Sequence, residues 1–233
     1  MLKEVFNKPT KWSVMRGLIL KEVDDLIIGS LGIVAFIAFF VGGVVSIQTA
    51  LNLTNPLIPK QLIGFATRQS IILEFAPTFI SIIMAGKMGS FITSSIGTMR
   101  VTEQIDALEV MGVNSLNYLV FPKIIASLLY PFLIGIAMFL GILGGWIAGV
   151  YGGFVASNEF VTGLQTNFIP FHITYAFIKT MVFAFLLSTI PSFHGYYMKG
   201  GALEVGKAST VSFVWTSVVI IVVNYILTQL LLT

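Results

Sequence analysis

The sequence contains no cysteine and few charged residues. Of its 233 residues, 10% are charged and 56% are hydrophobic, whereas about 25% of the residues in a soluble globular domain are charged. The lack of cysteine excludes disulfides and thiolate chemistry. The low charge excludes an ordinary soluble domain, and a net charge of only +3 gives no reason to expect a nucleic-acid partner.

The motifs of several enzyme classes are also missing. The sequence has no HExxH zinc motif, no GxSxG nucleophile elbow and no GxxxxGK[ST] phosphate-binding loop. His172 and His194 lie far apart, and we expect each to be an interfacial or hydrogen-bonded residue. We therefore predict no catalytic residue, metal site or cofactor in this chain. If ATP drives its activity, a separate ATPase chain must bind the ATP and Mg²⁺.

Long apolar runs are abundant instead, and they predict an all-α, polytopic membrane protein. No run shows the alternating pattern of a membrane β-barrel. The predicted transmembrane permease domain covers residues 26–233 and contains about five spans, at 26–51, 69–88, 117–155, 171–196 and 209–231.

Prolines and glycines refine this outline. A turn-rich stretch with Asn52, Asn55, Pro56 and Pro59 follows the first span. Pro77 predicts a kink in the second span and Pro131 allows a break in the third. The third span also carries glycines spaced by four, at Gly141, Gly145, Gly149 and Gly153, with Gly144 and Gly152 beside them. This spacing favours close packing between helices, with a direct substrate role as the less favoured alternative.

The N-terminal segment, residues 1–25, is basic and precedes any long apolar run. It has no small-residue cleavage site, so we do not expect a cleavable signal peptide. Trp12, Met15, Ile19 and Val23 recur at helical spacing. We predict an amphipathic helix over about residues 10–24 that lies on the inner membrane surface. The alternative is a disordered basic tail that only sets topology.

The distribution of Lys and Arg predicts the orientation in the membrane. Five spans place the termini on opposite sides, and a cytoplasmic N-terminus leaves only Lys60 and Arg68 of the basic residues outside. The C-terminus is then periplasmic. On this topology Gln48, Glu74, Lys179 and Asn224 lie at a similar depth near the outer ends of four helices. Charge in the bilayer is unfavourable, so they predict a cavity open to the outer side, with separate snorkelling to the interface as the alternative.

A charged island, Gly97–Gly112, separates the second and third spans. On a helix over about residues 102–112, Val101, Ile105, Leu108 and Met111 would form an apolar stripe, with Glu103, Asp106 and Glu109 on the opposite side. Thr102 is a candidate N-cap and Gly112 a candidate stop. Such a short helix cannot span a bilayer, and we expect it to dock on another protein.

Two stretches carry a family resemblance. Glu74–Gly112, EFAPTFISIIMAGKMGSFITSSIGTMRVTEQIDALEVMG, and the run from Gly195, GYYMKGGALEVGKASTVSFVWTSVVIIVVNYILTQLL, resemble the signature regions of MlaE-type permeases. These are the membrane subunits of bacterial lipid-transporting ABC systems. The resemblance extends over nearly the whole chain beyond the N-terminal helix.

The resemblance implies a homodimeric permease in the bacterial inner membrane. It implies two further partners, an ABC ATPase and an MCE-domain lipid-binding protein on the outer side, and a lipid, often a phospholipid, held between the two permeases. The implied ATPase-coupling residues are Glu103, Gln104, Asp106, Ala107, Leu108, Glu109, Met111 and Gly112. The candidate substrate-binding residues are Gln48, Arg68, Glu74, Lys179 and Asn224.

This chain departs from the family pattern at two positions. Leu73 stands where the family often has Arg immediately before the glutamate, and Asn224 stands for the usual acid of the last helix. Arg68 is a candidate replacement for the missing positive charge. These departures bear on headgroup preference.

Two other functions remain as alternatives. An ion-coupled secondary transporter could use Glu74 and Lys179 within the membrane, but it would give the acidic island no partner. An intramembrane enzyme acting on lipid would need a nucleophile or a metal cluster, and two distant histidines do not supply one.

Overall fold

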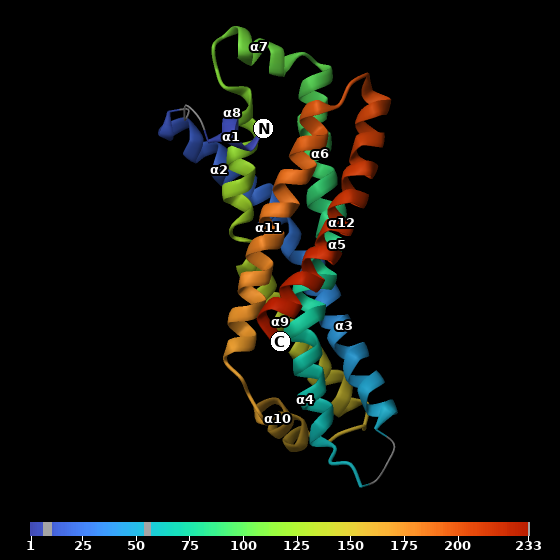
Figure 1. The fold of residues 1–233 in the computed structure, drawn as a ribbon. Coiled ribbons are helices and arrows are strands. Elements are labelled where there is room, and N and C mark those ends of the chain that lie inside the picture. Colours follow the sequence, from blue (N-terminus) through green and yellow to red (C-terminus); the bar gives the residue numbers. More distant parts are fainter. Residues whose placement is uncertain (7–10, 54–56, 233) are drawn as a thin grey trace. The chain divides into compact units, whose positions relative to one another are not determined.

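The predicted all-helical class is confirmed. The computed structural model describes residues 1–6, 11–53 and 57–232, and these ranges contain helices and no strand (Figure 1). Five helical runs within them are long and apolar enough to cross a membrane, namely Trp12–Asn52, Gln61–Val101, Ser115–Tyr151, Phe171–Tyr197 and Ala202–Leu232. The predicted helix start at Thr10, together with Asn55 and Pro56 of the predicted turn, lies outside the described residues.

Contacts divide the chain into two compact units, each assembled from segments that are distant in sequence. Unit 1 comprises Met1–Ser30, Ser81–Tyr130 and Met181–Thr233, and unit 2 comprises Leu31–Ile80 and Pro131–Thr180. The candidate substrate-binding residues, except Asn224, fall in unit 2. The predicted coupling helix falls in unit 1.

Unit 2 is held together by close helix packing through glycine. It contains α3 (Leu31–Asn52), α4 (Gln61–Ser70), η2 (Ile71–Phe79), most of α9 (Tyr130–Tyr151), α10 (Ser157–Gln165) and the first part of α11 (Phe171–Tyr197). A Cβ atom on Gly42 would lie 1.8 Å from the carbonyl oxygen of Gly141, and one on Gly144 would lie 2.0 Å from that of Phe39. Larger residues would separate α3 from α9, so the predicted packing role is confirmed for Gly141, Gly144, Gly145 and Gly149. Gly152 and Gly153 lie beyond the end of α9, and a Cβ on Gly153 would meet no neighbour within 4 Å.

Helix α10 was not predicted. It packs on α4 (Figure 1), where a Cβ on Gly163 would lie 1.9 Å from the carbonyl oxygen of Gln61. Phe160 of α10 is fully buried and forms a small core with Ile63 and Val155. A nine-residue amphipathic helix has too few apolar positions for its periodicity to stand out in the sequence.

Unit 1 contains the N-terminal helices, the predicted coupling helix and the C-terminal helix. Its elements are α1 (Leu2–Val5), α2 (Trp12–Leu26), η1 (Ile28–Ser30), most of α5 (Ile80–Met84), η3 (Ala85–Gly89), α6 (Ser90–Val101), α7 (Gln104–Val110), α8 (Ser115–Ser127), the last part of α11 and α12 (Ala202–Leu232). The N-terminal segment is helical over α2, and its place on the membrane surface stays a prediction. The short α7 connects α6 to α8 (Figure 1).

The second span is longer than the predicted 69–88. Helical structure continues from Gln61 to Val101 through two π-helical segments, η2 and η3. Charged residues are accommodated within this helical run. Lys87, for example, donates a hydrogen bond to the backbone carbonyl of Gly29 in the same unit. The kink predicted at Pro77 takes the form of η2, which contains that proline.

Two other boundaries differ from the prediction. The third span breaks between Ser127 and Tyr130, as expected near Pro131, but it ends at Tyr151 rather than at residue 155. The last helix begins at Ala202 rather than at residue 209. Gly200 makes the turn with φ of +116°, and the added helical turn contains a Glu204–Lys207 ion pair at 2.7 Å.

Candidate functional site

A buried lysine and a half-exposed glutamate form an ion pair inside unit 2. Nζ of Lys179, on α11, lies 3.0 Å from Oε1 of Glu74, on η2. The Lys179 side chain is 0% exposed and that of Glu74 is 43% exposed. The pair therefore has a closed, cationic side and an open, anionic side. A charge this deeply buried persists only when it is paired and hydrogen-bonded.

The local backbone explains why lysine is accommodated here. Pro77 has no N–H group to offer the carbonyl of Leu73, four residues earlier. That carbonyl accepts a hydrogen bond from Nζ of Lys179 at 3.0 Å. Tyr175, one turn before Lys179 on α11, accepts a third bond from Nζ at 3.0 Å. All three ammonium donors are used, so direct contact between Lys179 and a headgroup would require one of these partners to leave.

The Glu74 carboxylate is also held in place. Its second oxygen, Oε2, accepts a hydrogen bond from Oγ1 of Thr78 at 3.0 Å, while Oε1 accepts from Lys179. Thr78 is one helical turn further along the same segment. The two bonds fix the orientation of the carboxylate, and the side chain of Glu74 is 43% exposed. Sequence reasoning missed Leu73, Tyr175 and Thr78 as supporting groups, although the Pro77 and i, i+4 spacings point to them.

Arg68 lies where α4 meets the segment that follows α10. Its side chain is nearly buried and donates to the backbone carbonyls of Leu164 and Asn167, the latter at 3.2 Å. The guanidinium also faces the rings of Phe65 and Phe168, at 5.2 and 5.6 Å from their centroids. These contacts fasten the segment after α10 to α4.

The two histidines lie in different units. Nδ1 of His172 lies 3.0 Å from Oε1 of Gln69 in unit 2. The ring of His194 packs edge-on against Phe193 in unit 1, with the centroids 5.7 Å apart. Within the described ranges, no three His, Cys, Asp or Glu side chains are grouped as metal ligands.

The remaining candidates are on different units. Gln48 is exposed on α3 of unit 2. Asn224 is half-buried on α12 of unit 1, where its backbone carbonyl accepts a hydrogen bond from Thr228 at 2.8 Å. The structure therefore joins Glu74 to Lys179 directly, and the convergence of all four polar residues at one depth stays a prediction.

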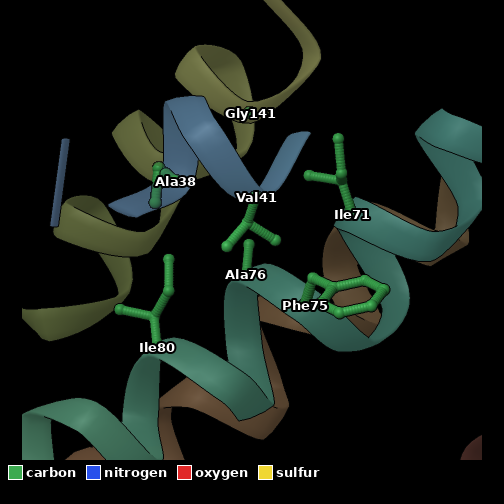
Figure 2. Close-up of a pocket in the computed structure, with 8 residues that line it drawn as sticks. Ala38, Val41, Ile71, Phe75, Ala76, Ile80 and Gly141 are labelled. Atoms are coloured by element: carbon green, nitrogen blue, oxygen red, sulfur yellow. The ribbon is translucent and has the colours of Figure 1, made fainter. Parts of the chain in front are cut away.

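A small apolar pocket lies beside Glu74 along η2. Figure 2 shows Ile71, Phe75 and Ala76 of this segment facing Ala38 and Val41 of α3. Its volume is about 10 Å³, which is roughly the space that a single water molecule needs. It cannot hold an acyl chain.

The coupling segment is a helix, but its ends and faces differ from the prediction. Helix α7 starts at Gln104 because Glu103 adopts a left-handed conformation, with φ of +58°. Thr102 is not the N-cap, since its hydroxyl donates back to the carbonyl of Thr98 at 2.9 Å. Gly112 stops the segment with φ of +75°, as predicted.

The predicted apolar stripe of this segment is only partly buried. Ile105 is fully buried, whereas Met111 is 67% exposed because α7 has already ended at Val110. Val110 is itself 89% exposed. Two of the acidic residues, although exposed, also bind within unit 1. Asp106 pairs with Arg100 at 2.8 Å, and Glu109 accepts hydrogen bonds from Ser115 and Tyr196, each at 3.0 Å. The exposed surface of the segment therefore carries acidic side chains together with the apolar Val110 and Met111.

Comparison with known proteins identifies similar permeases. A family profile described as Permease MlaE matches residues 19–230. A probable ABC transporter permease protein of Rickettsia bellii is 36% identical over 92% of this chain and 83% of its own. The intermembrane phospholipid transport system permease protein MlaE of Haemophilus influenzae is 29% identical over 92% and 82%. The chloroplastic protein TRIGALACTOSYLDIACYLGLYCEROL 1 of Arabidopsis thaliana is 33% identical over 86% of this chain and 57% of its own.

Proposed function

Because this chain belongs to the MlaE permease family, we propose that it is the membrane subunit of an ATP-driven phospholipid transporter in a bacterial inner membrane. The observation that carries the proposal is the buried Lys179, which holds a half-exposed carboxylate within apolar spans. Ionisable groups at such depth mark substrate pathways far more often than they serve stability alone. The chain itself hydrolyses no ATP in this proposal.

We further propose that Glu74 is the group that meets the lipid headgroup. Its exposed side can accept a hydrogen bond from an ammonium or hydroxyl group, since Thr78 and Lys179 already fix its orientation. Lys179 then acts by holding Glu74. Gln48 and Asn224 are proposed as further polar contacts, and Arg68 as the support of the α4–α10 end of unit 2.

The assembly we propose has three kinds of subunit. A homodimer of this chain encloses the lipid, an ABC ATPase with bound ATP and Mg²⁺ docks on α7 from the cytoplasm, and an MCE-domain protein receives or delivers lipid on the outer side. The N-terminus is cytoplasmic and the C-terminus periplasmic. The exposed Val110 and Met111 support the docking role of the α7 tip, because apolar side chains of that size usually meet a partner outside the bilayer.

Reconstitution tests this function. The permease, purified with its ATPase and placed in phospholipid vesicles, should transfer labelled phospholipid to acceptor vesicles only when ATP is hydrolysed. Glu74→Gln should lower transfer by about tenfold, because a charge-assisted hydrogen bond becomes a neutral one, while the complex remains assembled. Transfer driven by a proton or sodium gradient without ATP would favour the alternative, an ion-coupled secondary transporter that uses Glu74 and Lys179.

A further inference from the structure

A second polar site lies in unit 1, between helix α2 and the helices α6 and α8. A cavity of about 200 Å³ opens there, lined on its polar side by Lys21, Glu22, Ser95, Tyr118 and Lys123. Leu18, Met99 and Leu119 contribute to its apolar side. One water molecule occupies about 30 Å³ in the liquid, so the cavity has room for a polar group much larger than water.

The polar groups around this cavity are incompletely satisfied. Nζ of Lys123 donates to Oε1 of Glu22 and faces the ring of Phe91 at 5.8 Å. The Lys123 side chain is 4% exposed and that of Glu22 is 17% exposed. The second carboxylate oxygen, Oε2 of Glu22, is buried without a hydrogen-bond partner. A buried carboxylate oxygen in this state calls for a donor.

The charged and unpaired groups that line the cavity indicate which kind of molecule would bind there. Lys21 and Lys123 place two positive charges beside one carboxylate, so an anion is favoured near the lysines. Oε2 of Glu22 needs an N–H or O–H group. A molecule that carries a phosphate next to an ammonium or a hydroxyl meets both demands. The apolar residues on the other side suit the start of an acyl chain.

Among molecules with a phosphate beside an ammonium or hydroxyl group, the position of the site favours a membrane lipid. Helix α2 is amphipathic and leads through η1 into the apolar α3, an order that is typical of a helix at the depth of the headgroups. We propose that this cavity binds the headgroup of a resident phospholipid that has a protic group beside its phosphate, namely phosphatidylethanolamine or phosphatidylglycerol. Phosphatidylcholine presents the same phosphate and no N–H or O–H donor, so it leaves Oε2 of Glu22 unpaired.

This site is separate from the transport function proposed for Glu74. The lipid fastens α2 to α6 and α8 and is held rather than transferred. Helix α6 leads directly into α7 through Arg100, Val101 and Thr102. A lipid bound in the cavity would therefore influence the position of α7, the helix that we propose binds the ATPase.

The absence of native cysteine allows a local test. Ser95→Cys places a single thiol on the cavity wall of the full-length permease. The rate at which a small maleimide modifies this thiol is measured in detergent while dioleoyl-phosphatidylethanolamine, -phosphatidylglycerol or -phosphatidylcholine is titrated. Half-maximal protection should require about tenfold less of the first or second lipid than of phosphatidylcholine. The first two titrations also show which of the two lipids binds.

Matched variants in the same Ser95→Cys background complete the test. Glu22→Gln should reduce the preference over phosphatidylcholine by at least about threefold, because the donor then meets a neutral amide. Asp25→Asn removes one charge from an exposed position on the same helix and should leave the preference unchanged. Equal protection by phosphatidylcholine, or no protection by any lipid, would overturn the proposal and leave a water-filled cavity. If Glu22→Gln does not fold, the three titrations still decide. The readout does not depend on lipid transfer or ATP.

Discussion

At the scale of single residues, Lys179 and Glu74 show how one buried charge can organise a site. The ammonium donates to the backbone carbonyl of Leu73, a tyrosine hydroxyl and a carboxylate, each at 3.0 Å. Only the carboxylate is accessible. The lysine thus stabilises the irregular backbone of η2 and orients the group that we propose to contact lipid.

Removing this lysine tests its holding role. Lys179→Met should lower the free energy of unfolding by about 2 kcal/mol, less than the roughly 3–5 kcal/mol typical of fully buried pairs, because Glu74 is half exposed. The double variant Lys179→Met, Glu74→Gln should recover much of that loss, since no unpaired carboxylate remains. Thermal unfolding in detergent provides the measurement.

An exposed ion pair gives the control. Lys207→Met removes a lysine that pairs with Glu204 at 2.7 Å and is 63% exposed, and it should change stability by less than about 0.5 kcal/mol. The holding role is refuted if Lys179→Met is as stable as the parent protein, or if the double variant is no better than the single one.

At the scale of elements, α10 depends on contacts with α4 that only glycine permits. Gly163→Ala would place Cβ 1.9 Å from the carbonyl oxygen of Gln61, so the two helices must separate and the core around Phe160 must loosen. We expect a loss of about 2 kcal/mol or more and faster proteolysis or hydrogen exchange across residues 157–167. Gly206→Ala is the matched control, because that helical glycine has no neighbour within 4 Å. Equal behaviour of the two variants would contradict the packing argument.

The α7 segment carries a second prediction at this scale. Val110→Asp puts a charge on the exposed apolar tip and should reduce co-purification of the ATPase by about tenfold or more while the permease stays folded. Reversing the acidic charges with Glu103→Lys and Asp106→Lys should also detach it. Leu57→Asp, at a position that is likewise 89% exposed, lies on the predicted outer side and should have no effect. Full retention of the ATPase by the Val110 and charge-reversal variants would reject α7 as the docking element.

At the scale of the whole molecule, the orientation in the membrane is the main prediction. The bias of Lys and Arg places the α11–α12 turn in the cytoplasm and α10 on the outer side. Single cysteines at Gly201 and Asn158 suit this test, because both positions are exposed and the native chain has no cysteine. A membrane-impermeant maleimide should label Asn158→Cys in intact spheroplasts and Gly201→Cys only after the membrane is opened. The reverse pattern would place the Glu74 carboxylate nearer the cytoplasmic side.

The sequence by itself determined the class of the protein and several of its features. Apolar runs predicted five spans, basic and apolar spacing predicted the N-terminal helix, and the glycine row predicted close packing, because these signals depend on residues near one another in the chain. The motif Glu74–Gly112 indicated the family to which the chain belongs. The same local evidence singled out Glu74 and Lys179 as polar residues within apolar helices.

Only the tertiary structure decided what these residues contact. Lys179 and Leu73 are 106 positions apart, and no periodicity records that one satisfies the carbonyl of the other. The sequence offered Arg68 as a candidate replacement for the family arginine, and only the structure shows its bonds to the carbonyls of Leu164 and Asn167. The outward face of α7 depended on where Glu103 turns the chain and on Tyr196 binding Glu109. Partners of this kind are chosen by packing in three dimensions, because a buried donor or acceptor pairs with whatever group the fold brings within hydrogen-bond distance.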